Sequence, residues 1–315
     1  MSKVIFVSSG DSKYFPMLTE WVHSVRAHPE SSGMDIGILN AGMTEEELDY
    51  FRSIGCIVKE THWPAKIPAS RIRGREYLKS CISRPFLPDY FPGYDIICWM
   101  DADIWVQDWK AVSLFLKGAE RSALAVVPQA DRALPKAARL SWIGPFPFKP
   151  KSFYYSNAKI AFSGKIARSL FPFITVNAGI FAMRSDAPHW KRWQELILKA
   201  LEKGKVFTAE QLTLGMLIYL EKYKVEFLPS WCNWRCTTKP CWDEKLEKFV
   251  EPYLPHEPIG IMHLSGLDAA RVDRSVKDEI LLSEPPERRI SLSLRYPALD
   301  GEKIKPEGKK TASAV

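Results

Sequence analysis

Five apolar residues followed by two closely spaced carboxylates constrain the fold of this chain more than any other feature. The run Ile96-Ile97-Cys98-Trp99-Met100 precedes Asp101-Ala102-Asp103. A continuous apolar run of this length is typical of a strand buried on both faces, as in a parallel sheet. Ligands of open α/β sheets bind outside the carboxyl ends of the strands. The run therefore predicts that Asp101 and Asp103 lie at a ligand-binding edge.

Asp101 and Asp103 are residues of the type that binds hard cations. Crowded carboxylates suit Mg²⁺ or Mn²⁺, and such an ion neutralises a diphosphate, which indicates transfer from a nucleotide-activated donor. One alternative is that the pair only begins and caps a loop. Another is a haloacid-dehalogenase-like phosphatase, whose first Asp is a nucleophile on the first strand, followed by Thr or Ser. Here about a hundred residues precede the motif and Ile104 follows it, which disfavours a phosphatase.

The rest of the chain alternates between predicted strands and helices. We expect strands at 3–7, 35–39, 56–59, 96–100, 123–127 and 259–262, an apolar segment at 173–183, and helices at 14–28, 44–54, 188–201 and 209–222. The start of the second of these helices has the clearest signal, because Thr44 and Glu47 have the spacing of a capping box. Alternation of this kind predicts an α/β fold with a right-handed, mainly parallel sheet flanked by helices.

Composition places the chain among soluble globular proteins. Its 315 residues are 46% apolar and 26% charged, and they suffice for one large α/β domain or two ordinary ones. The longest apolar stretch, 212–220, is shorter than the ~20 residues of a membrane span. Residues 1–11 are typical of a first strand rather than a signal peptide. We therefore expect a cytoplasmic location.

The six cysteines include no Cys-x-x-Cys pair, which favours a reduced compartment with buried or incidental thiols. Cys232, Cys236 and Cys241 cluster in the sequence and, with His256, are a formal candidate for a zinc site. Their spacing is unlike that of a zinc finger or ribbon. A structural zinc site is therefore disfavoured.

Residues 131–168 hold eight basic residues and one acidic residue, in a chain with 44 basic and 37 acidic residues overall. The segment also contains seven aromatic residues and four prolines. Its basic residues are Arg132, Lys136, Arg139, Lys149, Lys151, Lys159, Lys165 and Arg168. Long structureless segments in compact domains are usually lids or binding loops. We expect an inserted loop on the acceptor side that contacts an anionic membrane; a solvated loop is the alternative. No motif supports nucleic-acid binding.

From residue 271 onward the sequence is charged and contains prolines, with ten basic and eight acidic residues through residue 310 and almost no helical period. Such a segment is expected to wrap the surface or fray. The sequence therefore predicts one domain over 1–270 and a partly irregular extension over 271–315.

Short motifs occur in one order along the chain. They are the block Cys98–Val106 around the two aspartates, Arg84 seventeen positions before Asp101, the run Asn177-Ala178-Gly179, the pair Glu210-Gln211 and the run His263-Leu264-Ser265-Gly266. In this order, over residues 4–271, they resemble family 8 glycosyltransferases, the group that includes glycogenin and bacterial lipopolysaccharide galactosyl- and glucosyltransferases. The resemblance implies a single-domain, nucleotide-binding fold of the GT-A type.

The resemblance also implies a set of roles. Asp101, Asp103 and His263 would bind Mn²⁺ or Mg²⁺, and Gln211, Glu210 and Asp103 are the catalytic candidates. The donor-binding candidates are Ser8, Asp11, Tyr14, Arg84, Ala102, Asn177, Ala178, Gly179, Gly266 and Arg271. The implied reaction moves a hexose from a UDP-sugar, with retention of configuration, to a glycan or lipid-linked acceptor. Gln211 would stabilise the cationic sugar, and a donor phosphate oxygen would take the acceptor proton.

Each motif also has a structural interpretation. His263 after a short apolar strand is compatible with an ordinary hydrogen-bonded histidine. Gln211 stands three residues after Thr208, as in a capping box. The Asn177 run is compatible with a strand bulge.

One position departs from the family pattern. Ala269 stands where the family has a Lys on the donor diphosphate, six residues after the His, and Arg271 is the candidate replacement. The missing Lys favours the alternative of a sugar-binding protein without turnover.

Overall fold

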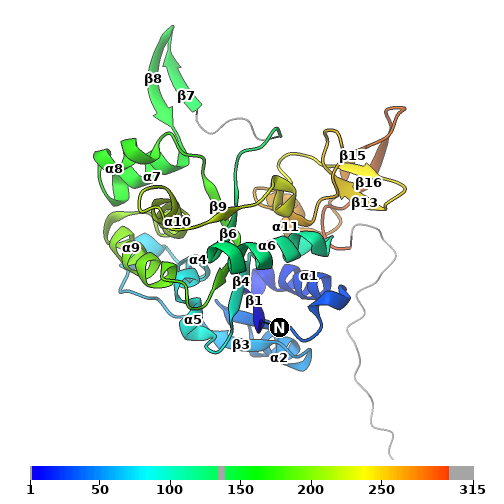
Figure 1. Cartoon of the computed structure of the whole chain (residues 1–315), viewed down its shortest axis with the longest axis horizontal. Coiled ribbons are helices and arrows are strands. Elements are labelled where there is room, and N and C mark those ends of the chain that lie inside the picture. Colours follow the sequence, from blue (N-terminus) through cyan, green and yellow to red (C-terminus); the bar gives the residue numbers. More distant parts are fainter. Residues whose placement is uncertain (1, 134–138, 298–315) are drawn as a thin grey trace, which may run out of the picture.

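The computed structural model describes residues 2–133 and 139–297, and a seven-stranded sheet forms its centre (Figure 1). The strand order is β10-β6-β9-β4-β1-β2-β3. Their bounds are β1 Val4–Gly10, β2 Asp35–Asn40, β3 Ile57–Glu60, β4 Ile96–Met100, β6 Leu124–Pro128, β9 Val176–Arg184 and β10 Glu226–Phe227. Only β9 is antiparallel to its neighbours, β4 and β6. The predicted α/β class with a mainly parallel sheet is confirmed.

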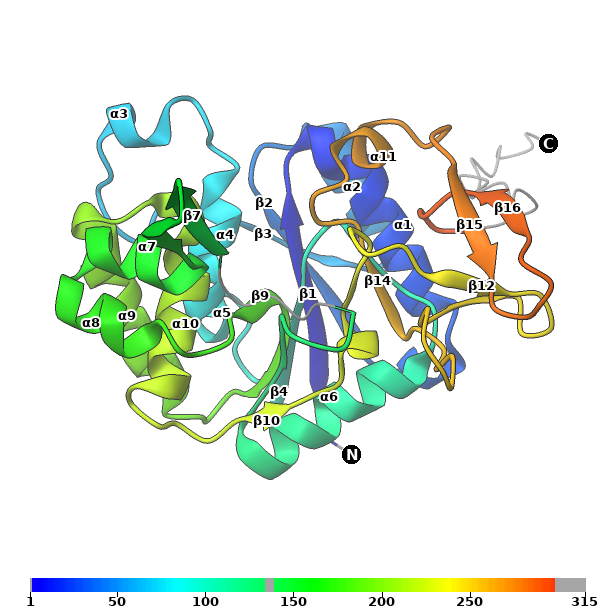
Figure 2. The same cartoon turned by 90° about the horizontal axis from the view of Figure 1, so that it is seen from above.

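Helices cover both faces of this sheet because successive strand residues point to opposite sides. Ile5 and Val7 of β1 join the apolar cluster that contains residues of α4, α9 and α10, whereas Phe6 joins the cluster of α1 and α6 (Figure 2). The bounds are α1 Phe15–Arg26, α4 Leu78–Ser83, α6 Trp109–Ser122, α9 His189–Lys203 and α10 Ala209–Tyr219.

Several further helices are short. They include α2 Glu45–Ser53, α3 Ala69–Ile72, α5 Leu87–Tyr90 and the 3-10 turns η1 Ser12–Tyr14, η2 Pro29–Ser31, η3 Arg84–Phe86, η4 Val206–Thr208 and η5 Ser230–Cys232. The capping box predicted at the start of α2 is present, with both reciprocal bonds between Thr44 and Glu47. Within residues 2–133 and 139–297, no helix combines the length and apolar character needed to cross a bilayer.

A three-stranded sheet joins the aspartate motif to the predicted histidine. Its strands are β5 Ile104–Val106, β11 Trp234–Arg235 and β14 Ile261–His263, in the order β11-β14-β5. The register places His263 opposite Ile104 on one side and beside Arg235 on the other. Residues 159 positions apart in the sequence are therefore neighbours at the end of β4.

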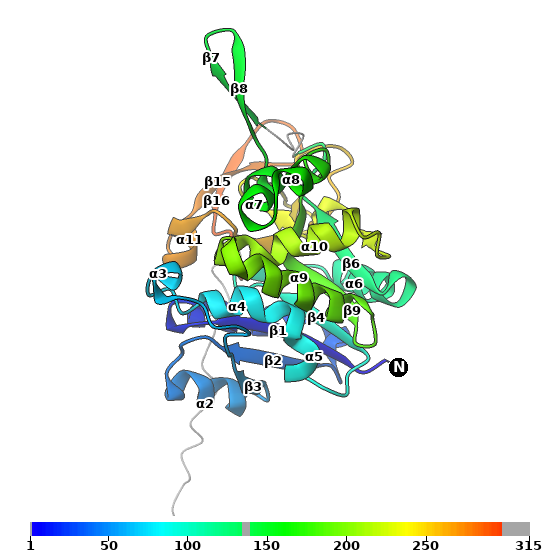
Figure 3. The same cartoon turned by 90° about the vertical axis from the view of Figure 1, so that its left-hand side faces the viewer.

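The segment 131–168 is largely regular, so the expectation of a structureless loop is wrong. It contains the hairpin β7 Arg139–Ile143 and β8 Phe146–Lys151, the helix α7 Phe153–Ala161 and the start of α8 Gly164–Leu170. Ser152 and Ser163 cap the two helices, and Tyr154 and Ala158 of α7 reach the central core. The hairpin projects from the body of the protein (Figures 1 and 3). Residues 134–138 lie outside the described residues.

The extension predicted from residue 271 onward contains some regular structure in its described part, residues 271–297. The helix α11 spans Asp268–Val272, and strands β15 Asp278–Leu282 and β16 Arg289–Leu292 join β12 Cys241–Asp243 and β13 Lys248–Val250 in a four-stranded sheet. This sheet contains strands from both sides of residue 270. The domain boundary proposed at residue 270 stays a prediction. Residues 298–315 lie outside the described residues.

A buried ion-pair network fixes the C-terminal strands to α1. Arg295 donates two hydrogen bonds, of 2.9 and 2.8 Å, to the carboxylate of Glu20, and Arg274 donates a third of 2.9 Å. Glu20 and Arg295 are 6% and 3% exposed. Because water cannot replace these partners, removal of Glu20 would leave a buried cation unpaired.

We expect Glu20→Ala to lower the free energy of unfolding by about 3–5 kcal/mol, the usual cost of breaking a buried ion pair. Urea unfolding followed by circular dichroism measures the change. The matched control is Glu45→Ala, whose pair with Arg52 is exposed and should leave the unfolding midpoint unchanged. Equal midpoints for the two variants would contradict the structural role of this network.

Candidate active site

A cavity of about 370 Å³ opens at the carboxyl ends of β1 and β4 and contains most of the predicted site residues. Those that line it are Asp11, Tyr14, Arg84, Asp101, Ala102, Asp103, Asn177, Gly179, Glu210, Gln211, His263 and Arg271. The further lining residues are Ser9, Gly10, Tyr77, Ser80, Cys81, Gln129, Phe153, Phe207, Thr208, Arg235 and Ser265. The ends of strands and helices therefore bring residues that are remote in the sequence together in this cavity.

Three predicted residues do not line this cavity. Ser8 is fully buried, and its neighbour Ser9 faces the cavity instead, because adjacent strand residues point to opposite faces. The Ser9 hydroxyl donates to the carbonyl of Leu39 at 2.8 Å. Ala178 takes part only through its backbone. Gly266 adopts a φ of +85°, which explains a glycine after Ser265.

Asp101, Asp103 and His263 form the one group of potential metal-ligating side chains found among the described residues. One ligand atom from each lies within 4.8 Å of the others. Asp103 and His263 are buried, and the Nε2 of His263 lies 3.4 Å from Oδ1 of Asp103. Two carboxylates and one imidazole form a donor set that suits Mn²⁺ or Mg²⁺.

Neighbouring groups orient each of these three side chains. Arg84 and the Trp99 indole both donate to Oδ1 of Asp101, at 2.7 and 2.8 Å. Arg271 donates to Oδ2 of Asp103 at 3.1 Å. The second oxygen of each carboxylate remains for an ion, the arrangement expected when outer groups fix metal ligands.

The environment also sets the charge of the two carboxylates. Burial raises the pKa of Asp101, although Arg84 opposes it. Burial also disfavours the charged form of Asp103, but His263 and Arg271 outweigh it and lower the pKa of Asp103 to about 2. The surroundings therefore favour the ionised form of Asp103 more strongly than that of Asp101.

Asn233, which the sequence analysis missed, orients His263. Its Oδ1 lies 2.8 Å from Nδ1 of His263, so a proton on Nδ1 is donated to Asn233 and Nε2 is left to face Asp103. Asn233 follows the short turn η5, and no motif or period marks it in the sequence.

Gly179 leaves room between the three potential ligands. A Cβ at this position would lie 2.6 Å from Cε1 of His263 and 2.7 Å from Oδ2 of Asp101. Its backbone N–H donates to Oδ1 of Asn177 at 2.7 Å. The space is therefore available only because residue 179 has no side chain, and the residues present fit a small cation.

Arg84 is 6% exposed and connects three elements of the site. Its guanidinium donates to Asp101, to the carbonyl of Ala178 at 2.9 Å and to Glu210 at 3.4 Å. It also lies over the Trp99 ring, 4.9 Å from its centroid. The side chain predicted to contact a donor is thus also the group that holds β4, β9 and α10 together.

Gln211 does not complete a capping box, so that structural interpretation is wrong. Thr208 makes no side-chain cap bond to α10, and its hydroxyl instead donates to Oδ1 of Asn157 at 3.0 Å. The Oε1 of Gln211 accepts from the backbone N–H of Ala178 at 3.3 Å. The bulge interpretation of this segment is confirmed, since the pairing of β6 and β9 shifts between Val126 and Val127.

Tyr14 of η1 and Arg271 of α11 also line the cavity. Burial raises the pKa of Tyr14 to about 12, although Arg271 opposes it, so the phenol keeps its proton. Arg271 contacts Asp268 as well as Asp103. The side chain proposed to replace the missing Lys is therefore engaged by two carboxylates of the chain itself.

Comparison with known proteins identifies the family. The model of glycosyl transferase family 8 matches residues 5–236, and the chain belongs to this family. The expected GT-A-type α/β fold is confirmed with it. No curated protein matches the chain in sequence.

Three solved structures of glycosyltransferases are among those similar to the chain. Galactosyltransferase LgtC, in complex with donor and acceptor sugar analogues, is 16% identical over 83% of this chain and 87% of its own, with a TM-score of 0.49. The bifunctional glycosyltransferase WbbM is 16% identical over 77% and 40%, with a TM-score of 0.47. Glycosyltransferase GlyE of Streptococcus pneumoniae TIGR4 is 17% identical over 75% and 47%, with a TM-score of 0.43.

The Glu210 carboxyl should make stability depend on pH. Burial raises its pKa from 4.5 to about 7, although Arg84 opposes it, so the folded chain favours the neutral form. The contribution of this group to the free energy of unfolding is complete below pH 4.5 and is lost as pH rises through about 7. The loss is on the order of 3 kcal/mol. We expect the free energy of unfolding to fall less in Glu210→Gln than in wild type when the pH is raised from 5 to 7.5.

Urea unfolding at these two pH values, in chelator so that no ion perturbs the site, measures the difference. The other titrating groups cancel when the variant is compared with wild type. An identical pH dependence in both proteins would contradict a raised pKa of Glu210.

Proposed function

We propose that the chain is a metal-dependent, retaining glycosyltransferase that moves a hexose from a UDP-sugar to a glycan or lipid-linked acceptor. Family membership supports the transferase class. The observation that carries the finer proposal is the convergence of Asp101, Asp103 and His263 on the space kept open by Gly179. We infer that these residues hold Mn²⁺ or Mg²⁺ beside the donor diphosphate.

The bound ion would act as a Lewis acid that offsets the negative charge on the departing nucleoside diphosphate. The chain itself supplies the positions of the other groups. Arg84 donates to Asp101 and to the Ala178 carbonyl, and Gln211 accepts from the N–H of Ala178, within the Asn177–Gly179 run of donor-binding candidates. From there the Gln211 amide would stabilise the cationic sugar electrostatically.

We assign Glu210 a positioning role. Its carboxylate lies 3.4 Å from Arg84, it is 5% exposed, and its second oxygen Oε2 has no hydrogen-bond partner. A group this enclosed is poorly placed to exchange a proton with an acceptor. A donor phosphate oxygen would take that proton instead, so the mechanism requires no protein base.

A sugar-binding protein without turnover is the second candidate. Two observations favour it: Ala269 provides no cation, and Arg271 is already paired with Asp103 and Asp268. Hydrolysis of a UDP-sugar in Mn²⁺ distinguishes the two candidates, because only an enzyme releases UDP.

We expect Asp103→Asn to reduce UDP release from the preferred donor by roughly a hundredfold or more, because one charged ligand is removed from the ion. The assay is a screen of UDP- and GDP-sugars with Mn²⁺, Mg²⁺ or chelator, which reads the released nucleotide. Full activity in chelator, or in the folded variant, would contradict the mechanism.

Gly179→Ala provides an independent test of the same site. We expect weaker Mn²⁺ binding in calorimetry, because the new methyl group would occupy the space between His263 and Asp101. Gly164→Ala is the matched control: its Cβ would approach only Arg168, at an ordinary 3.5 Å. Equal Mn²⁺ affinity in both variants would place the ion elsewhere.

We also propose that the hairpin β7–β8 contacts an anionic membrane that carries the acceptor. Five large apolar side chains of the hairpin are exposed: Leu140, Trp142, Ile143, Phe146 and Phe148, with fractions from 50% to 73%. The segment 131–168 also carries the excess of basic residues. Apolar and aromatic side chains together with positive charge suit the interface of an anionic bilayer.

We expect Trp142→Ser with Phe146→Ser to weaken binding to vesicles of phosphatidylglycerol and phosphatidylcholine roughly tenfold, because two interfacial side chains are lost. Sedimentation with the vesicles measures binding, and UDP release should not change. Leu246→Ser, a 52% exposed control in another turn, should bind as wild type does. Binding that is absent or insensitive to salt would contradict membrane contact. So would a wild-type dimer in ultracentrifugation that the double variant loses, because the hairpin would then join two copies of the chain.

A further inference from the structure

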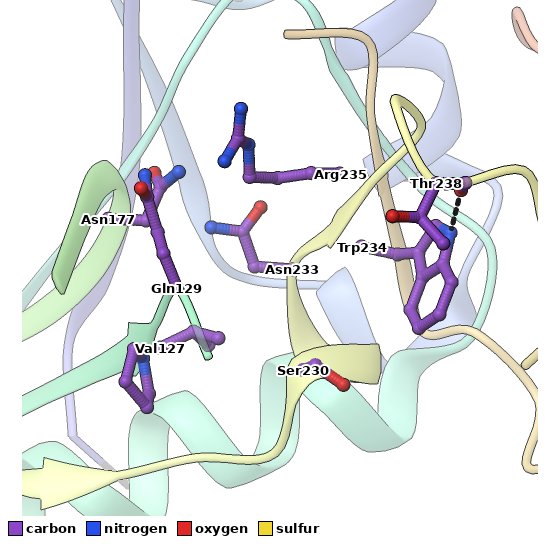
Figure 4. A pocket seen from close by; sticks show the side chains of 9 residues that line it. Val127, Gln129, Asn177, Ser230, Asn233, Trp234, Arg235 and Thr238 are labelled. Carbon is purple, nitrogen blue, oxygen red and sulfur yellow. Dashed lines mark hydrogen bonds between the residues drawn. The ribbon is translucent and has the colours of Figure 1, made fainter. Parts of the chain in front are cut away.

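Arg235 reaches the cavity from the strand next to His263. In the three-stranded sheet, Arg235 of β11 is paired in register with His263 of β14. Its side chain lines the cavity, and Figure 4 shows the guanidinium extending toward Gln129 and Asn177, away from the backbone of its own strand. No motif predicted this side chain, because β11 has only two residues and its position depends on pairing with β14.

Arg235 differs from the other arginines of the cavity because no acidic group of the described chain pairs with it. Arg84 is engaged by Asp101 and Glu210, and Arg271 by Asp103 and Asp268. The Nε of Arg235 is buried without a hydrogen-bond partner, and burial lowers the pKa of its guanidinium. A half-buried, unpaired cation is costly for a folded protein.

The groups around Arg235 are polar and add further donors. The Nδ2 of Asn233 is also buried without a partner, while its Oδ1 is occupied by His263. Gln129 and Asn177 complete this side of the cavity, and in Figure 4 their amides face the same space as the Arg235 guanidinium and Asn233. Unpaired donors around a guanidinium match the oxygens of a phosphate or a carboxylate.

We propose that Arg235 binds an oxyanion of the substrate, a phosphate or a carboxylate, and thereby selects acidic substrates. The proposal rests on the proposed transferase function. The oxyanion has two sources: the diphosphate of the nucleotide donor, since Arg235 adjoins His263, or an acidic group on a sugar bound against Gln129 and Asn177. In either case Arg235 supplies a cation that Ala269 does not.

Calorimetric titration in Mn²⁺ distinguishes the sources with UDP and glucose 6-phosphate as probes and glucose as the neutral comparison. We expect Arg235→Gln to weaken one of the two anions roughly tenfold or more, as loss of a charge-assisted bond does. If only the affinity for UDP falls, Arg235 binds the donor diphosphate. If only the affinity for glucose 6-phosphate falls, Arg235 binds an acidic group on a sugar. Arg235→Lys should recover part of the affinity. Arg184→Gln, at the far end of β9, is the control.

A second readout separates binding from a structural role. Because Arg235 is unpaired, Arg235→Gln should leave the Tm of the ligand-free protein unchanged or raise it. A lowered Tm, or affinities for both anions within twofold of wild type, would overturn the proposal. Manganese-dependent binding of UDP by the wild-type chain tests the transferase function separately: if only glucose 6-phosphate binds, and binds through Arg235, that function fails while the anion site stands.

Discussion

The buried guanidinium of Arg84 is the interaction on which the geometry of the site depends. It joins the end of β4 through Asp101, the bulge of β9 through Ala178 and the first turn of α10 through Glu210. A cation removed from water is tolerated only when all of its partners are in place. The free-energy cost of burying the Arg84 guanidinium is offset only when the three elements approach in one arrangement. That arrangement sets where the two aspartates and Gln211 lie.

The reversed strand β9 gives this arrangement its shape. It is antiparallel to both neighbours in an otherwise parallel sheet, and the register shift between Val126 and Val127 leaves Ala178 and Gly179 without partners on β6. The Ala178 N–H and carbonyl are then free for Gln211 and Arg84. The missing side chain of Gly179 leaves the space between Asp101 and His263. A regular strand would direct these backbone groups into the ladder instead.

Local pattern explains which parts of the structure were predictable. The apolar run before Asp101 and the capping box at Thr44 depend on neighbouring residues alone, so the sequence predicts both, and the order of motifs predicts most of the cavity. In the segment 131–168 the sequence pattern is misleading because the apolar residues of the hairpin are exposed and follow no core period, whereas Tyr154 and Ala158 of α7 are buried. Asn233 and Arg235 were missed because the pairing of β11 with β14, remote in sequence, decides their position.

The three arginines of the cavity differ in their partners, and the stability of the folded chain does not explain the difference. Arg84 and Arg271 neutralise the aspartates that would otherwise repel each other, and both arginines are thereby used by the folded chain. Arg235 gains nothing of this kind, although a neutral side chain at the same position would avoid the cost of partial burial. Natural proteins retain such locally unfavourable residues mainly at functional sites. The unpaired cation therefore indicates a negative partner that arrives with the substrate.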